Sequence, residues 1–347
     1  MRIRFTSSVL SSEEFFPILD VLALLVEAGR HSFDPANIPD ILSSEWIKNR
    51  SVDLKELIKL SALKRSHDNL VDQSVVTVDD SCRKGGIVDF PNSDTRLAPL
   101  DAIQFLTTPF HVIVENEWFD GAFLLWMAKA IDFNRLISAY REGRFVFRHA
   151  GGKDAIPRCA AVLSNGVWPR GDAAYSRAMR LWACVFLDSD AKHPADNPNA
   201  QIVAEALPNV IFVHQLKKRS IESYIPSHFL SKYDQSAGFR RRVSALGRLT
   251  RQQQLYFHMK VGFKHDEPNS PAKASYLASA KVLPQEKALF GGIIDNDWLE
   301  LMSGFGKKLS EIYVDQRYRP NPNDVNFVDQ LDKQELAALT KAIYERL

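Results

Sequence analysis

The chain has 347 residues, of which 45% are hydrophobic and 25% are charged, an ordinary globular composition. Its formal net charge of +2 points to no particular class of partner. Three cysteines are too few and too scattered for a disulfide framework or a four-ligand zinc site. The N-terminus lacks a secretory pattern, and the longest strongly apolar run, 21–26, is too short to cross a bilayer. We therefore expect a soluble, cytoplasmic protein of two or three folding units with no membrane partner.

The first part of the chain, residues 1–105, predicts a mostly helical region. Apolar periodicity predicts a largely buried helix over 12–29 and a second helix near 53–64. The stretch 74–99 is richer in Val, Asp, Gly and Pro, which predicts short strands and turns. No residue of this region suggests a chemical role.

Residues 106–226 predict an α/β domain with a parallel sheet. Four β-rich runs alternate with apolar-periodic helical segments near 119–140, 153–163 and 200–206, a pattern typical of a parallel sheet with helices on both faces. Residues 227–347 predict a helical C-terminal region punctuated by prolines. The four expected strands are FHVIV (110–114), RFVFRH (144–149), LWACVFL (181–187) and VIFVHQ (210–215).

Acidic residues directly follow two of these strands. Glu115 follows the first, and Asp188 and Asp190 follow the third in the run VFLDSDA. Ligands of open parallel sheets bind beyond the carboxyl ends of the strands, so neighbouring strands would bring three carboxylates together. Such a cluster repels itself unless a cation is bound, and hard oxygen ligands suit Mg²⁺ or Mn²⁺. Asp120 is either an auxiliary ligand or an acid that complements the start of a helix.

Three segments resemble the Toprim family in order and spacing. VENEWFDGAFL (114–124) resembles the first Toprim motif, and RHAGGKDAI (148–156) resembles the turn after the second strand in the nuclease branch. LKKRSIESYI (216–225) is similar to the Arg-x-x-Glu-x-Tyr segment of overcoming-lysogeny-like and related phage-defence nucleases. The chain departs from the family at Asn116, where a glycine is common. It also contains no G-x-x-x-x-G-K-[ST] sequence of an ATPase.

The resemblance implies a Toprim, Rossmann-like domain that hydrolyses phosphodiester bonds with one or two divalent cations. It implies catalytic roles for Glu115, Asp188 and Asp190, and it adds Glu222 near the metal and Lys260 C-terminal to the acids. The alternative for Glu222 is a surface helix start paired with its basic neighbours, and the alternative for Lys260 is a solvated lysine. The implied setting is antiphage defence with a separate ATPase or sensor protein. A homo-oligomer is compatible with this interpretation, and the sequence does not distinguish DNA from RNA as substrate.

Basic residues gather in one stretch of the chain. Nine Lys or Arg and two acids lie between Lys217 and Arg251, which gives this stretch a charge of +7 and the remainder −5. A concentrated positive charge attracts a polyanion, and we expect backbone contacts that carry no sequence information. The residues expected to bind nucleic acid are Lys153, Lys217, Lys218, Arg219, Arg240, Arg241 and Arg242.

Two alternatives to a nuclease stay open. Primases and topoisomerases use the same Toprim acids, but primases add a zinc module and topoisomerases add a nucleophilic tyrosine in another domain, and neither is recognisable here. The second alternative is a non-catalytic nucleic-acid-binding or effector-sensing module that keeps the metal site for recognition. Fold alone does not decide between them, because function belongs to the site.

Overall fold

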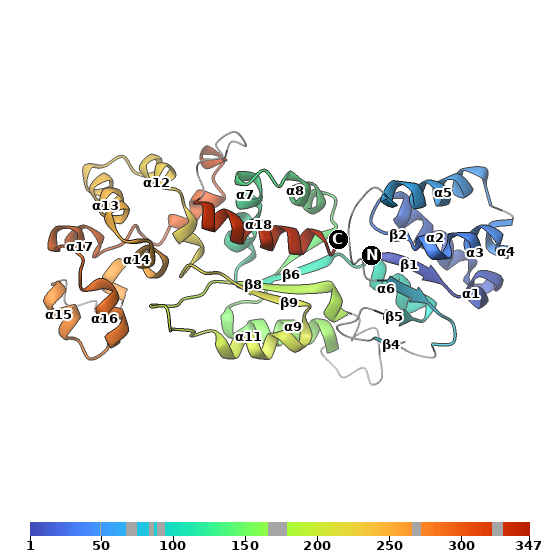
Figure 1. Ribbon diagram of the computed structural model, residues 1–347, viewed down its shortest axis with the longest axis horizontal. Coiled ribbons are helices and arrows are strands. Elements are labelled where there is room, and N and C mark those ends of the chain that lie inside the picture. Colours follow the sequence, from blue (N-terminus) through green and yellow to red (C-terminus); the bar gives the residue numbers. More distant parts are fainter. Residues whose placement is uncertain are drawn as a thin grey trace.

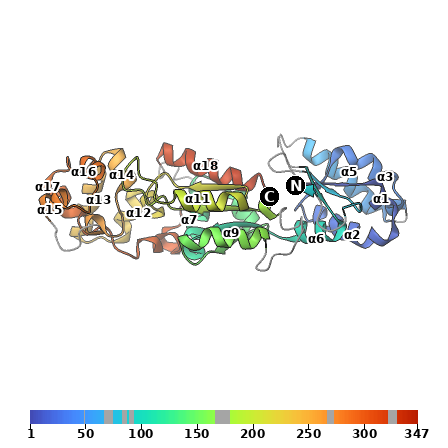
Figure 2. The same ribbon diagram turned by 90° about the horizontal axis from the view of Figure 1, so that it is seen from below.

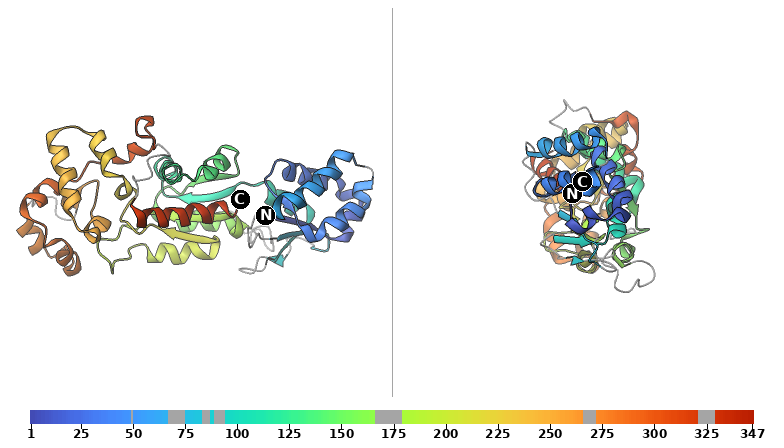
Figure 3. Two further views of the ribbon diagram at one scale, coloured as in Figure 1. Left: turned by 45° about the horizontal axis from the view of Figure 1, so that its top comes forward. Right: turned by 90° about the vertical axis from the view of Figure 1, so that its right-hand side faces the viewer.

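The computed structural model describes residues 1–48, 50–66, 75–82, 87–88, 94–165, 179–265, 272–320 and 329–347. The molecule is elongated, with an N-terminal unit at one end, a central unit and a helical unit at the other end (Figure 1). Both chain ends lie close together, near the junction of the N-terminal and central units (Figure 3). In the described part of the chain, no helix is both long and apolar enough for a membrane span.

The N-terminal unit is built on a five-stranded sheet with the order β2-β1-β3-β5-β4. All neighbouring strands are parallel except β4, which runs antiparallel to β5. The strands expected within 74–99 are therefore confirmed, but the sequence did not indicate that two earlier strands join them. These earlier strands have four and two residues, too few to show a periodic pattern. The strands are β1 (Arg2–Phe5), β2 (Ser32–Phe33), β3 (Val75–Val78), β4 (Ile87–Val88) and β5 (Asp94–Leu97).

Helices make up most of the described N-terminal unit, as predicted, and they surround this sheet. The two expected helices are present as α2 and α5. In α2, Pro17 lies in the first turn, where its missing N–H has no intrahelical partner to lose. The side chains that α2 buries follow helical spacing: Leu19, Leu22, Ala23 and Val26. The helices are α1 (Ser7–Ser11), α2 (Phe16–Glu27), α3 (Ile38–Ser43), α4 (Glu45–Lys48), α5 (Val52–Ser66) and α6 (Pro99–Thr107).

The central unit contains the four predicted strands as a parallel sheet with the order β7-β6-β8-β9. All five residues of β8 are buried, which explains its uninterrupted apolar sequence. Helices α7 and α8 lie on one face of the sheet, and α9 and α11 lie on the other (Figures 1 and 2). The unit is thus a Rossmann-like α/β fold. The elements are β6 (Phe110–Val114), α7 (Ala122–Ala130), α8 (Asn134–Arg141), β7 (Phe145–His149), α9 (Ile156–Asn165), β8 (Ala183–Leu187), α11 (Ala200–Ala206) and β9 (Phe212–Gln215).

The last helix of the chain, α18 (Gln330–Tyr344), packs against α7 and α8 of the central unit. It therefore lies on the α7 side of the central sheet, and its first turn reaches α14 (Arg251–Tyr256) of the C-terminal region (Figure 1). The predicted division at residue 227 did not separate this helix from the rest of the C-terminal region. Its position brings a distant segment of sequence to the sheet that carries the candidate site.

The remaining C-terminal helices form a separate unit, as their sequence predicted. Its core is aromatic: Phe263 stacks on Trp298 with ring centroids 3.8 Å apart, and Tyr276 and Phe290 contact the same ring of Phe263. Described residues of this unit contain no strand. The helices are α12 (Ser227–Tyr233), α13 (Ala237–Arg248), α14 (Arg251–Tyr256), α15 (Lys273–Ala278), α16 (Pro284–Phe290) and α17 (Asp295–Leu301).

Candidate functional site

The carboxyl edge of the central sheet brings together acids from two neighbouring strands. Glu115 follows β6, and Asp190 lies three residues beyond β8, which pairs with β6 in parallel. Lys153 lies between the two acids. Its Nζ is 3.9 Å from Oε2 of Glu115 and forms an ion pair with the carboxylate of Asp190. The side chain of Lys153 therefore points at the acids, although the sequence led us to expect it at a nucleic-acid surface.

The turn after β7 determines where Lys153 lies. Gly151 and Gly152 have φ angles of +84° and +123°, which residues other than glycine rarely adopt. The chain then enters α9 through a short 3-10 turn, Lys153–Ala155. Asp190 also has a left-handed backbone, with φ of +54°, and its N–H donates to the carbonyl oxygen of Arg219 at 2.8 Å. The turn after β7 and the turn after β8 thus both contain residues with positive φ, and Lys153 and Asp190 connect them at the sheet edge.

Asp188 is held by the segment that follows β9. Its Oδ1 accepts the N–H of Ile221 at 2.9 Å. Burial raises the pKa of Asp188 well above its usual value, and the negative charges of Glu222 and Asp120 raise that pKa further. The charges of Lys153 and Lys260 oppose this rise without cancelling it.

Glu222 is fully buried in the 3-10 turn Ile221–Tyr224. Its carboxylate accepts hydrogen bonds from Ser310 Oγ at 2.5 Å and from Ser220 Oγ at 2.7 Å. The same carboxylate lies 3.0 Å from Nζ of Lys260. The alternative expectation, an exposed helix start paired with the preceding basic residues, is therefore wrong. Glu222 belongs to the interior, beside the acids of the sheet edge.

Lys260 reaches Glu222 from a backbone that is packed tightly against a second chain segment. A Cβ atom on Gly262 would lie 2.1 Å from the carbonyl oxygen of Leu301, so only glycine allows this approach. Burial by itself lowers the pKa of Lys260, but the ion pair with Glu222 and the carboxylates of Asp188 and Asp120 outweigh it and raise that pKa. Lys260 is thus a charged lysine directed at the acids.

Asp120 lies in a π-helical turn, Glu117–Gly121, directly after the first acid. Its carboxylate accepts the N–H of Asn116 at 2.8 Å, and the Asn116 side chain accepts the N–H groups of Trp118 and Phe119. Asn116 therefore caps this turn. Burial raises the pKa of Asp120 to about 6, with further contributions from the charges of Glu115 and Glu222.

The expected metal ligands were Glu115, Asp188, Asp190 and Asp120. In the ranges that the structure describes, no group of three or more His, Cys, Asp or Glu side chains has a geometry ready to hold a metal ion. The ammonium groups of Lys153 and Lys260 contact the carboxylates instead. The donor set still fits a hard divalent cation, because carboxylate oxygens are the ligands that such cations prefer. Binding of Mg²⁺ or Mn²⁺ stays a prediction.

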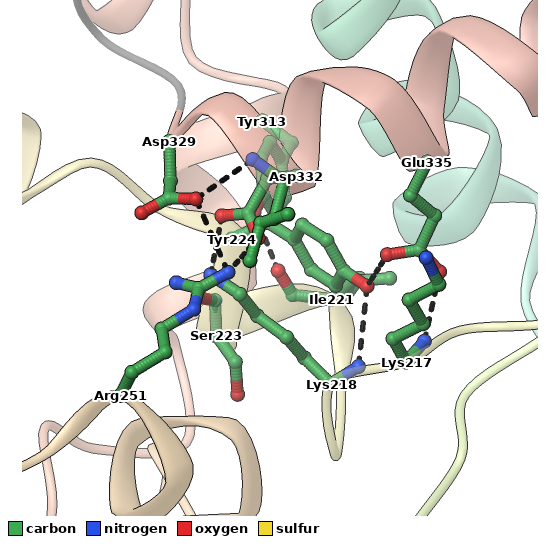
Figure 4. Close-up of polar contacts among 11 residues, drawn as sticks. Lys217, Lys218, Ile221, Ser223, Tyr224, Arg251, Tyr313, Asp329, Asp332 and Glu335 are labelled. Carbon is green, nitrogen blue, oxygen red and sulfur yellow. Dashed lines mark hydrogen bonds and ion pairs between the residues drawn. The ribbon is translucent and has the colours of Figure 1, made fainter.

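The basic residues 217–219 do not form the exposed patch that the sequence predicted. The Nζ of buried Lys218 lies 2.5 Å from Oδ2 of Asp332, and Arg251 contacts the other oxygen of that carboxylate at 2.6 Å (Figure 4). Arg219 is buried as well, and its guanidinium donates to the carbonyl oxygen of Tyr256 at 3.2 Å. The expectation that Lys218 and Arg219 contact a phosphate backbone is therefore corrected, because both side chains are inside the protein. Only Lys217 of the three is exposed.

Glu335 of α18 forms further hydrogen bonds with the segment 217–224. Its carboxylate accepts the Tyr224 hydroxyl at 2.6 Å and the N–H of Lys217 at 2.8 Å (Figure 4). Burial by itself raises the pKa of Glu335, but these hydrogen bonds and the nearby imidazole of His214 outweigh it and lower that pKa. The C-terminal helix thus fixes the backbone on both sides of Glu222.

The arginines of α13 differ in their surroundings. Arg241 forms an ion pair with Glu300 at 2.6 Å, and Arg242 donates to the carbonyl oxygen of the same residue while its guanidinium lies over Phe239. Arg240 is exposed and has no ion pair with any described residue. Of the predicted phosphate-binding arginines, Arg240 is therefore the one whose charge is directed to solvent alone.

Comparisons with protein-family models, curated proteins and solved structures gave no match. Function is therefore inferred from the site itself. Sequence reasoning missed three residues of this site: Ser220 and Ser310, which bind Glu222, and Tyr313, whose hydroxyl donates to the carbonyl oxygen of Ile221 at 2.7 Å. No local pattern marks the last two, because they lie about ninety positions away in the chain.

Proposed function

We propose that this protein is a metal-dependent nuclease that hydrolyses phosphodiester bonds of nucleic acid. One observation carries the proposal: carboxylates from three chain segments and two lysines converge at the carboxyl edge of a parallel sheet. This is the edge where open α/β sheets bind their ligands. The residues are Glu115, Asp120, Asp188, Asp190 and Glu222, with Lys153 and Lys260.

Each group has a role in this proposal. Mg²⁺ or Mn²⁺ at Glu115, Asp188 and Asp190, with Asp120 as a further ligand, would polarise the phosphate and activate water. Glu222 holds Lys260 so that its ammonium group is available to developing negative charge on the phosphate. Lys153 would exchange its carboxylate partners for a phosphate oxygen, which releases Glu115 and Asp190 for metal binding.

The biological setting is part of the same proposal. The order of the three Toprim-like segments supports a nuclease of the phage-defence type, and we propose an antiphage effector. Because the chain contains no P-loop sequence, nucleotide control would come from a separate ATPase or sensor protein.

Incubation of the purified protein with plasmid, single-stranded DNA and tRNA tests the proposal directly. We expect cleavage products with Mg²⁺ or Mn²⁺ and none with EDTA. The Asp295→Asn variant is a suitable control for charge changes elsewhere, because the Asp295 side chain is 85% exposed and lies outside the site. A protein that leaves all three substrates intact with either metal would contradict the nuclease assignment.

A second candidate is a non-catalytic module that binds or senses nucleic acid. Lys153 and Lys260 favour it, because they already neutralise part of the acidic cluster without a metal ion. This candidate predicts nucleic-acid binding that is equal with and without Mg²⁺ and is not followed by cleavage.

A further inference from the structure

A groove of about 920 Å³ lies beside the acidic cluster. It is bounded by α7, α8, the edge strand β7 and the segment 313–320. Its volume is in the range of sites that hold organic ligands. Glu117 and Trp118, which line the groove, follow Glu115 by two and three residues. The groove therefore shares the turn Glu117–Gly121 with Asp120 of the candidate site, and the proposed reaction does not use it.

Aromatic side chains line this groove, and two of them are open to solvent. Trp118 is 66% exposed and Tyr140 is 41% exposed. The ring of Phe147 lies 5.5 Å from that of Tyr140. A Cβ atom on Gly121 would lie 2.9 Å from Phe147, so this glycine lets the π-helical turn rest on the ring. Exposed aromatic rings offer faces on which the bases of a ligand can stack, and single π-helical turns often occur at functional sites.

The charge around the aromatic rings is mainly positive. Lys129, Arg141 and Arg319 line the groove, against one acid, Glu117. None of the three cations forms an ion pair with any residue that the structure describes, which differs from the paired arginines of α13. Exposed aromatic rings interleaved with free cations suit single-stranded nucleic acid, whose bases stack while its phosphates meet positive charge.

We propose that this groove binds unpaired nucleotides of the substrate. Bases stack on Trp118 and Tyr140, and the phosphates contact Arg141, Lys129 and Arg319. The inference rests on the proposed function and narrows it: the substrate contains a single-stranded segment beside the bond that is cut. A duplex does not fit this recognition, because its bases are stacked on one another and do not offer their faces.

Binding without cleavage tests the proposal. The affinity of the full chain for labelled oligothymidine and oligouridine of about 12 nucleotides is measured by fluorescence anisotropy in EDTA, with a blunt DNA duplex as competitor. Trp118→Ala and Tyr140→Ala should each raise Kd about tenfold, in line with about 1 to 3 kcal/mol for one stacked base. Arg141→Ala should lower the slope of log K against log salt by about 0.7.

Two exposed residues outside the groove provide matched controls. Arg135→Ala removes an exposed arginine of the same helix α8 that lies outside the groove, and Leu100→Ala removes an exposed apolar side chain of the N-terminal unit. Both should keep the parental Kd and salt slope. Melting temperatures of all variants should match the parent, because the replaced side chains are at least partly exposed.

The outcomes separate this inference from the proposed function. If the parent and Trp118→Ala bind oligonucleotides equally well, the groove is not the nucleotide-binding site, although the proposal of a nuclease stays supported. The same result is expected if the groove binds a protein segment in place of nucleotides. If duplex competes as well as single strand, the claim of unpaired nucleotides is wrong. If the parent binds no nucleic acid even at low salt, both proposals fail.

Discussion

The two sheets of this protein share one sequence feature and use it differently. In each, an acidic pair follows a central parallel strand: Asp79 and Asp80 after β3, and Asp188 and Asp190 two residues apart after β8. Asp79 accepts the N–H and hydroxyl of Ser81 at 2.9 and 2.7 Å and lies 3.6 Å from Arg96. The Asp79 carboxylate is therefore hydrogen-bonded within its own turn and lies close to a cation.

Asp188 accepts one N–H. Burial raises its pKa, and the neighbouring carboxylates of Glu222 and Asp120 raise that pKa further. The difference does not lie in the strand or in the acid that follows it. It lies in the groups that surround the acids. In the N-terminal sheet these are Ser81, two residues away, and Arg96 of the neighbouring strand β5. In the central sheet they are further acids together with Lys153 and Lys260, which come from separate segments of the chain.

The largest expected difference between the sheets is in activity. Asp188→Asn should reduce cleavage by about 100-fold or more, because it removes a metal-binding charge while keeping the shape of the side chain. Asp190→Asn and Glu115→Gln should do the same. Asp79→Asn is the matched change in the other sheet and should cut at the parental rate. Equal activity of the Asp188 and Asp79 variants, measured as initial rates on one substrate, would remove the distinction between the sheets.

The buried carboxyl group of Asp120 should appear as a pH dependence of stability. Burial raises the folded pKa of Asp120 to about 6, against an ordinary value of 3.8, so the folded protein holds this proton more tightly than the unfolded chain. In metal-free buffer the contribution of Asp120 to the free energy of unfolding should therefore rise by about 1 kcal/mol as pH falls from 7 to 5. Denaturant titrations of the parent and Asp120→Asn measure this. The variant should show a clearly smaller rise, and identical profiles would speak against the assignment.

The ion pairs of the two sheets should differ in strength. Lys260→Met leaves the buried carboxylate of Glu222 without its cation and should cost about 2 to 3 kcal/mol of unfolding free energy. Arg96→Met removes the partner of Asp79, but the Arg96 side chain is 47% exposed and should contribute less than about 1 kcal/mol. Glu222→Gln with Lys260→Met should recover part of the loss. Chemical denaturation of the parent, the two single variants and the double variant measures these free energies of unfolding. Equal losses for Lys260→Met and Arg96→Met would contradict the prediction.

The smallest expected effect concerns the basic surface of α13, which has no counterpart in the N-terminal unit. Arg240, Arg241 and Arg242 replaced together by Ala should lower the log–log salt slope of binding by about 0.7 to 0.9, the contribution of one phosphate contact. Three contacts would lower it three times as much, but Arg241 and Arg242 are engaged with Glu300. Arg240→Ala alone should therefore equal the triple variant. A much larger effect of the triple variant would show that the two paired arginines also reach the nucleic acid.

How much the sequence predicted depended on the length of its patterns. The central sheet was predictable because β6 and β8 are five-residue apolar runs, and the parallel order then placed Glu115 beside Asp190. In the N-terminal sheet, β2 has two residues and gave no signal. The partners inside the site were beyond sequence reasoning for a different reason. Ser310 lies 88 positions from Glu222, and Asp332 lies 114 positions from Lys218, so no spacing rule connects them.

The resemblance to Toprim nucleases indicated Glu222 and Lys260 as site residues, and the structure pairs them at 3.0 Å. The interpretation of residues 217–219 as a surface patch failed because charge counted along a chain does not show which side chains are buried. Lys218 and Arg219 satisfy partners inside the protein, and these partners come from α18 and from the end of α14. Composition predicted attraction to a polyanion, and only the fold shows which cations are free to provide it.

The return of α18 to the central unit has a consequence for the order of folding. Asp332 contacts Lys218 across 114 positions of the chain, and Glu335 contacts Tyr224 across 111 positions. Contacts this far apart in sequence form only after the entropy cost of closing a long loop has been met. We therefore expect the turn that carries Glu222 to become ordered late in folding, after the helices that form through local contacts.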